Sequence, residues 1–232
     1  MRLVPQRRAN RVVLGVVTVL VVIIGLSAAA YWTPLMSVRS TDVEGNKAVP
    51  GVQILSAANV ANGTPLLQVD TEAVAQRVAA IPSVESVRVQ RGYPSTLQIT
   101  VVERTPVALV VDNDKVHVLD RSGVGYLTYA KDETPPEIKK LPTLHTATPG
   151  PADPTTKAAL RVLADLPTNL SGLVQTVSTR SPVDIELGLT RDRTVVWGDS
   201  TQTEDKARTL TALLTRKATE YNVSAPDFPS YK

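Results

Sequence analysis

The sequence contains no cysteine among its 232 residues. This absence excludes disulfide frameworks and thiolate-bound zinc or iron–sulfur centres, and it fits a protein outside the cytoplasm. Aromatic residues make up only 4%, with a single Phe, so the cores must be built from Val, Leu, Ile and Ala. Apolar residues account for 43%, which is enough for one or two packed domains and argues against disorder throughout.

Basic charge is scarce outside the N-terminus, although the formal net charge is +3. Four of the 25 basic residues lie in residues 1–30, which contain no acid, so residues 31–232 hold 21 basic and 22 acidic residues. A nucleic-acid-binding face needs clustered positive charge and usually a recognisable motif. We therefore expect no nucleic-acid partner.

An apolar run follows the basic N-terminus. Residues 12–30 carry no charge, and a helix of nineteen residues is about 28 Å long, close to the roughly 30 Å of a bilayer's hydrocarbon core. Arginines precede the run, and Tyr31 and Trp32 follow it at the expected level of the headgroups. The pattern predicts a single-pass type II plasma-membrane protein with a cytoplasmic N-terminus and its bulk outside.

The expected boundaries are a cytoplasmic tail at 1–11, a transmembrane helix at 12–32 and a linker at 33–37. The residues taken to mark the membrane span are Val12, Leu20, Ile24 and Ala30. A cleavable signal peptide is the alternative, because the small residues 28–30 satisfy the cleavage pattern. The apolar run is longer than a usual signal core, which favours the uncleaved anchor.

Residues 38–105 are predicted to form a strand, two helices and two strands. The first strand is expected at 38–44, and the first helix at 52–61 shows apolar residues at i, i+3, i+4 and i+7. Asp70 is expected to cap the second helix. The run from 83 to 103 then alternates apolar and polar residues on both sides of a turn, which is typical of a hairpin with one buried face.

Residues 106–225 are predicted to be mostly β with some helix. Strands are expected near 107–130 and again at 173–179, 183–188 and 193–198, with a long surface loop at 131–154 containing one short strand. Asp153 and Pro154 form a cap and first-turn pair for one helix. Thr201 and Glu204 have the spacing of a capping box for the last helix, and 226–232 is expected to be an extended tail.

Residues for catalysis are few. The two histidines, His117 and His145, are isolated in the sequence, and no G-x-S-x-G or S-x-x-K motif is present. A metal needs several convergent ligands, and no histidine pair at ligand spacing occurs. We therefore expect no catalytic, cofactor-binding or metal-binding residues, and no cofactor.

Several segments resemble one known family. They are "VRSTDVEGN" at 38–46, "IPSVESVRVQRGYPSTLQITVVERTPVALV" at 81–110, "VLDRSGVGY" at 118–126, and "VDIELG" ahead of "DKARTLTALL". In this order they resemble the FtsQ family of bacterial cell-division proteins, called DivIB in some bacteria, in its actinobacterial form. The resemblance covers almost all of the chain after the apolar run, and the run from Ile81 to Ala108 is its most specific part.

The resemblance implies an α+β fold: a single N-terminal transmembrane helix, a POTRA domain (β-α-α-β-β) at 38–105, and a family-specific mixed α/β domain, mostly β, at 106–225. It implies a non-enzymatic divisome scaffold that links early and late division proteins at the septum. The implied partners are FtsB and FtsL, bound through the β domain, and further division proteins such as FtsW and the septal penicillin-binding protein.

The physical basis for such a role is the open edge of a sheet, whose unpaired N–H and C=O groups can bond to a strand of another chain. The resemblance implies a partner edge at the C-terminus, for which the candidates are Tyr221, Val223, Phe228, Ser230 and Tyr231. A second candidate edge is the first POTRA strand, with Val38, Arg39 and Val43.

Two other functions are kept as alternatives. One is a secreted or anchored cell-envelope enzyme, which the missing nucleophile and metal signatures disfavour. The other is a polypeptide-handling module, since POTRA domains also occur on outer-membrane barrels. The chain shows no series of ten-residue amphipathic strands, which a barrel requires.

Overall fold

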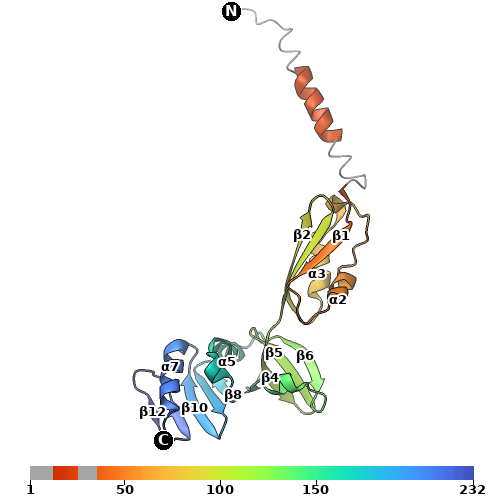
Figure 1. Ribbon diagram of the computed structural model, residues 1–232. Helices are drawn as coiled ribbons and strands as arrows, with labels where there is room; N and C mark the ends of the chain where they lie inside the picture. Colours follow the sequence, from red (N-terminus) through yellow and green to blue (C-terminus); the bar gives the residue numbers. More distant parts are fainter. Residues whose placement is uncertain (1–12, 26–35) are drawn as a thin grey trace, which may run out of the picture. The chain divides into compact units, whose positions relative to one another are not determined.

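The computed structural model describes residues 13–25 and 36–232 (Figure 1). Two compact units divide the chain at residues 103 and 104. Residues 13–25 are helical with exposed side chains, and Leu20 and Ile24 lie on this helix. The predicted tail, Val12 and Ala30 lie outside the described residues. In the described ranges, no helix combines the length and the apolar character needed to cross a membrane.

The first unit has the predicted order of strand, two helices and two strands. The elements are β1 (Ser40–Glu44), α2 (Gly51–Ala58), the short helix η2 (Leu66–Gln68), α3 (Thr71–Ala79), β2 (Val84–Gly92) and β3 (Thr96–Glu103). In the sheet, β3 is central, parallel to β1 and antiparallel to β2. Two strands of this sheet, β1 and β2, therefore have one free edge each.

Alternate residues of β3 are buried and form the centre of this unit's core. Leu97, Ile99 and Val101 are at most 2% exposed, because alternate residues of a strand share one face. Helices α2 and α3 pack against them through four buried residues, Ile54, Ala58, Val74 and Val78.

Helix boundaries in this unit follow local chemistry. The Asp70 carboxylate accepts hydrogen bonds from the backbone N–H of Glu72 and Ala73 at 3.1 and 3.0 Å, which confirms the predicted cap. The prediction that the first helix reaches residue 61 is wrong. Asn59 adopts a left-handed conformation (φ 46°) and its N–H donates to the Leu55 carbonyl, which ends α2 at Ala58.

Glu103 at the end of β3 is held within the first unit. Its carboxylate accepts hydrogen bonds from the backbone N–H groups of Lys47, Ala48 and Val49 at 2.7–3.0 Å. Burial alone raises the pKa of Glu103, but these N–H groups outweigh burial and lower it. These bonds join the end of β3 to the loop after β1, more than fifty residues earlier in the chain.

Arg104, the next residue, is held within the second unit. Its guanidinium pairs with the carboxylate of Asp120, whose side chain is 1% exposed. Asp120 also accepts from the N–H groups of Ser122 and Val124, each at 2.9 Å, which closes the turn before β6. Burial raises the pKa of Asp120, while the bonds from Ser122, Val124 and Arg104 together lower it.

The second unit is fully described and contains a nine-stranded sheet in the order β12-β11-β10-β9-β8-β7-β4-β5-β6. Its strands are β4 (Pro106–Asp112), β5 (Lys115–Asp120), β6 (Gly125–Ala130), β7 (Thr143–His145), β8 (Val174–Ser181), β9 (Asp184–Leu189), β10 (Arg193–Gly198), β11 (Glu220–Asn222) and β12 (Ser230–Tyr231). The helices are α4 (Pro136–Lys139), α5 (Pro154–Asp165), α6 (Thr168–Ser171) and α7 (Thr203–Leu213).

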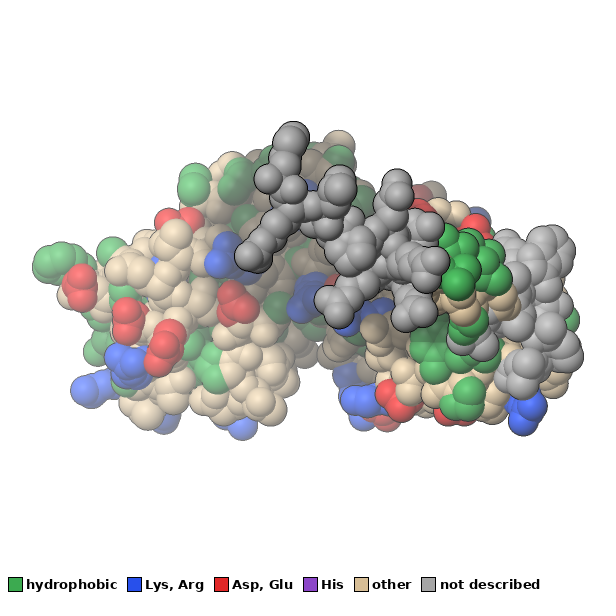
Figure 2. Space-filling view, turned by 90° about the horizontal axis from the view of Figure 1, so that it is seen from above, with side chains coloured by type: hydrophobic (Ala, Val, Ile, Leu, Met, Phe, Trp, Pro, Cys, Tyr) green, Lys and Arg blue, Asp and Glu red, His purple; other side chains and the backbone are tan. Residues whose placement is uncertain are grey.

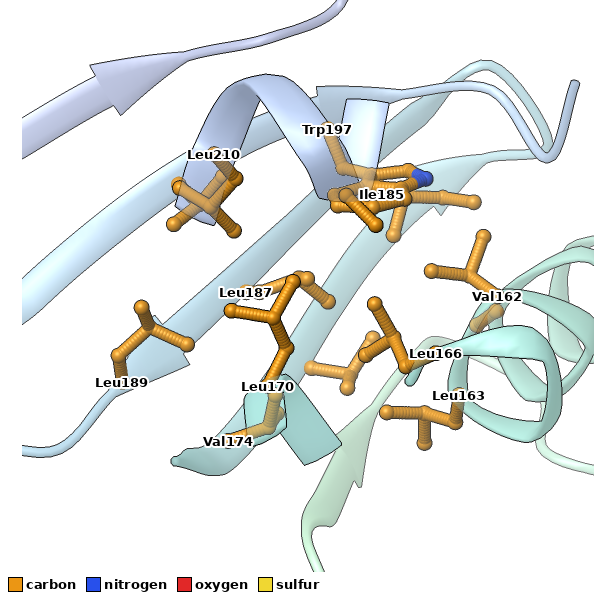
Figure 3. Packing of buried hydrophobic residues seen from close by; sticks show 14 of the residues in the cluster. Val162, Leu163, Leu166, Leu170, Val174, Ile185, Leu187, Leu189, Trp197 and Leu210 are labelled. Atoms are coloured by element: carbon orange, nitrogen blue, oxygen red, sulfur yellow. The ribbon is translucent and has the colours of Figure 1, made fainter. Parts of the chain in front are cut away.

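The main core of this unit lies between the sheet and helices α5 and α7 (Figures 1 and 3). Val162 and Leu163 of α5, Leu166 directly after it, and Leu210 of α7 point toward Leu187 and Trp197 of the sheet (Figure 3). Each fully buried aliphatic side chain contributes about 1.5–3 kcal/mol. Trp197 is fully buried, and its Nε1 has no hydrogen-bond partner.

Of the two helix starts predicted in the second unit, one is confirmed and the other is wrong. Asp153 caps α5 by accepting from the N–H groups of Thr155 and Thr156, as predicted. The predicted capping box is wrong, since α7 begins at Thr203 after Gln202 in a left-handed conformation. Thr201 instead donates its hydroxyl to Asp199 at 2.7 Å.

Removing the Asp120 carboxylate is expected to destabilise the second unit. Asp120→Ala removes the buried ion pair with Arg104 and leaves the backbone N–H groups of Ser122 and Val124 without this acceptor, which costs on the order of 3 kcal/mol. Urea unfolding of residues 36–232 measures the loss. Asp165→Ala is the matched control, because the Arg161–Asp165 pair is exposed and contributes at most about 1 kcal/mol. Equal losses in the two variants would contradict this account.

Acid is expected to weaken the second unit through Asp199. The buried Lys206 ammonium and the Thr201 hydroxyl donate to Asp199 and lower its pKa to about 2. Because the folded pKa lies below the unfolded one, the stabilisation is complete above about pH 4 and is lost as the pH falls toward about 2.

Asp199→Asn should therefore reduce the slope of unfolding free energy against pH between about pH 4 and pH 2, measured by denaturant titration at each pH. The slope should not vanish, since the pKa values of Asp120 and Asp153 are lowered as well. An unchanged slope in the variant would show that Asp199 does not contribute to the acid response.

Candidate protein-docking edges

The C-terminal edge of the large sheet is formed by β11 and β12. Strand β11 is parallel to β10, and β12 folds back antiparallel to β11 with Tyr221 opposite Tyr231 and Asn222 opposite Ser230. The N–H of Lys232 donates to the Glu220 carbonyl at 3.0 Å. The end of the predicted extended tail thus joins the sheet, and β12 becomes its outermost strand.

Two of the five candidate residues on this edge have buried side chains. Tyr221 is 1% exposed and Val223 is fully buried, and both belong to the main core. The Tyr221 hydroxyl lies 2.9 Å from the Arg216 carbonyl and 3.2 Å from that of Ala218. These side chains support the edge from within and do not face outward, contrary to the contact role that the sequence suggested for them.

The other three candidates lie at the surface. Phe228 is 87% exposed and Tyr231 is 50% exposed, and Ser230 is exposed as well. Phe228 is the only Phe of the chain, and it lies in the loop between β11 and β12. The edge therefore combines an unpaired strand side with two exposed aromatic rings.

An ion pair between a buried lysine and a partly exposed aspartate supports the turn that leads from β10 into α7. Lys206 is fully buried, and its Nζ donates to the Asp199 carboxylate at 2.7 Å and to the Asp199 carbonyl at 3.0 Å. A buried ammonium requires such partners. Sequence patterns did not reveal this role, because Lys206 looks like a surface residue of an amphipathic helix.

The first strand of the first unit, β1, offers a second edge. Val38 is fully buried, and its N–H donates to the Thr64 carbonyl at 2.9 Å. Arg39 is exposed, and Val43 is half-buried against the core of the unit. A cavity of about 300 Å³ lies beside β1 and is lined by residues that include Arg39, Leu55 and Val60. The predicted start of this strand at residue 38 is wrong, because β1 spans Ser40–Glu44. Of the three candidates only Val43 lies on β1, while Val38 and Arg39 precede it.

The opposite end of the large sheet is also open. Strand β6 pairs only with β5, and Tyr126, Leu127 and Tyr129 pack with Leu109, Val116 and Val118 of the neighbouring strands. Burial, followed by the nearby charge of Asp120, raises the pKa of Tyr126 to about 12. This edge was not among the sequence candidates.

Neither histidine is assembled with other reactive groups. His117 Nδ1 lies 2.9 Å from the Thr128 hydroxyl, and His117 lines an open cavity of about 550 Å³ together with Val110, Leu119 and Pro149. His145 is exposed at the end of β7. Among the described residues, no group of three or more potential metal ligands converges.

Acidic and basic side chains are interspersed on the face that Figure 2 shows. This face gives no sign of the single-signed surface that binding to nucleic acid needs.

Comparison with known proteins finds a matching family model and relatives that align with almost the whole chain. A family model described as "POTRA domain, FtsQ-type" matches residues 36–104. Relatives named "Cell division protein FtsQ" match almost the whole chain: that of Mycolicibacterium smegmatis is 44% identical over 97% of this chain and 66% of its own length. The Mycobacterium tuberculosis relative is 45% identical over 97% of this chain and 70% of its own length.

A Streptomyces venezuelae relative of the same name is 33% identical over 97% of this chain and 84% of its own length. All three organisms are actinobacteria, the group that the sequence resemblance indicated. The chain spans about two thirds of the length of the two mycobacterial relatives.

Proposed function

This chain belongs to the FtsQ family of cell division proteins, and on that premise we propose that it is a non-enzymatic scaffold of the division septum. It holds other division proteins by accepting their strands at its sheet edges. The observation that carries this proposal is the C-terminal edge, where β12 is bonded on one side only and lies beside the exposed Phe228 and Tyr231.

The proposed partners at this edge are FtsB and FtsL. An added strand would gain main-chain hydrogen bonds from β12, and selectivity would come from neighbouring side chains. Phe228, Ser230 and Tyr231 are the contact residues, while Tyr221 and Val223 hold the edge in place from the core. FtsW and the septal penicillin-binding protein are proposed as further members of the same assembly.

The POTRA edge is proposed as a separate docking place. Its free side along β1 adjoins the cavity lined by Arg39 and the partly exposed Leu55. An extended segment bound there would pair with β1 and bury apolar side chains against α2. Val43 supports this strand from the core side.

The membrane anchor is proposed from the apolar run at 12–32. Leu20 and Ile24 lie on the described helix with exposed apolar side chains, which suits a lipid environment. With the arginines before it on the cytoplasmic side, residues 36–232 would lie outside the cytoplasm. A fluorescent fusion that forms a band at midcell in dividing cells would support the septal location, and a uniform envelope signal would contradict it.

Phe228→Ala is expected to weaken partner binding without unfolding the β domain. An aromatic residue that anchors an interface commonly contributes about 2 kcal/mol or more, so the dissociation constant should rise at least about tenfold. The measurement is a fluorescence titration of the full-length chain in detergent with the extracytoplasmic segment of the cognate FtsB. Removal of residues 226–232 should weaken binding further, with a thermal midpoint close to that of the intact chain.

Val111→Ala is the matched control, because Val111 is an exposed apolar residue of β4, on the other half of the same sheet. It should leave the affinity unchanged. If Phe228→Ala and the truncation bind FtsB as tightly as the intact chain does, the C-terminal edge is not the docking site.

A further inference from the structure

A cleft with four cations lies at one end of β10 and β11. It has a volume of about 500 Å³. Its lining includes Arg191 from the β9–β10 turn, Arg193 at the start of β10, and Arg216 and Lys217 from the segment after α7. Tyr221 of β11 forms part of its wall. Two segments that are distant in sequence thus bring their positive charges to one hollow.

These four cations have no acidic partner in the described part of the chain. Elsewhere in the second unit Arg104, Arg161, Arg180 and Arg208 each pair with a carboxylate. The nearest acids along the chain do not neutralise the cleft, because Glu220 pairs with Lys232 and Asp192 is an exposed turn residue outside the lining. The cleft therefore keeps its positive charge for a ligand.

The cleft is also held in shape before any ligand binds. Arg191 and Asp192 both have left-handed backbones (φ 65° and 53°), a conformation that Asn and Gly adopt far more readily than Arg. The Arg193 Nε donates to the Thr190 carbonyl at 3.1 Å, which orients the guanidinium. The Tyr221 hydroxyl secures the opposite wall through the carbonyls of Arg216 and Ala218.

We propose that this cleft binds the carboxylates of an acidic segment in the partner that docks on the C-terminal edge. The inference rests on the proposed function and names the chemistry of the partner. Strand β12 ends beside the cleft, since the N–H groups of Thr219 and Glu220 donate to the Lys232 carbonyl at 2.9 and 3.1 Å. A strand laid along β12 would pass close to the cleft at one end and to Phe228 at the other.

A peptide is favoured over a free phosphate or a lipid headgroup because only a peptide can use both features. Arginine forks bind carboxylates through paired hydrogen bonds, and the adjacent strand edge supplies main-chain bonds. A soluble anion would gain the side-chain contacts alone. The expected partner segment is therefore extended, with Asp or Glu residues at the end that lies over the cleft.

Fluorescence anisotropy with a labelled hexaglutamate peptide and the full-length chain in detergent tests the cleft itself. Binding should be saturable and should weaken strongly between about 20 mM and about 200 mM salt. The double variant Arg191→Gln with Arg216→Gln should bind at least about tenfold more weakly. Its matched control is Lys131→Gln with Lys157→Gln, which removes two exposed cations elsewhere in the same unit and should bind as the intact chain does.

Two outcomes of this assay would overturn the inference. Equal weakening in both double variants would mean that only overall charge matters. Tighter binding of pyrophosphate or of phosphatidylglycerol vesicles than of hexaglutamate, with sensitivity to the Arg191 and Arg216 changes, would assign the cleft to phosphate chemistry instead.

The same double variants in the FtsB titration separate this inference from the proposed function. Weaker FtsB binding by the arginine variant and not by the lysine control supports the inference. If Phe228→Ala weakens FtsB binding and the arginine variant does not, the docking edge stands and the role of the cleft is refuted.

Discussion

Backbone N–H and C=O groups must find partners, and this requirement shapes both units of the molecule. Inner strands such as β3 and β9 satisfy it on both sides. Among residues 13–25 and 36–232 the outermost strands find no second partner, so β1, β2, β6 and β12 each present one unpaired side. Most proteins cover or disrupt such edges, and here the short β12 leaves an edge with exposed aromatic residues beside it.

Packing on one face decides which strands become edges. Helices α5 and α7 cover the large sheet through Val162, Leu163 and Leu210. A shift of one residue in any covered strand would turn its apolar side chains to water. The register is therefore fixed from the core outward. Tyr221 and Val223 extend this core to β11. The burial of these two side chains therefore fixes the position of the C-terminal edge.

Much of this arrangement could be predicted from the sequence because its causes are local. Alternation along β3 and the caps at Asp70 and Asp153 depend on residues within a few positions of each other. The parallel pairing of β7 with β4 and β8 and the return of β12 to β11 join distant segments. No short-range sequence pattern predicts these strand pairings. The hydrogen bonds from the loop at 47–49 to Glu103 could not be predicted for the same reason.

The candidate docking site also combines features that the sequence predicts with features that depend on contacts between distant segments. Its exposed aromatic residues were visible in the sequence, since Phe228 and Tyr231 stand out in a chain with few rings. The inward orientation of Tyr221 and the basic cleft were not, because Arg191 and Arg216 meet only after β10 and β11 pair.

The C-terminal strand is held to the sheet lightly, which bears on how an edge can be selective. Strand β12 has two residues, and its flanking Lys232–Glu220 pair is exposed, which contributes at most about 1 kcal/mol. So short a strand supplies few main-chain bonds to a partner. Selectivity must then come from the side chains at its ends, an aromatic ring on one side and fixed cations on the other, because main-chain bonding alone would accept any extended segment.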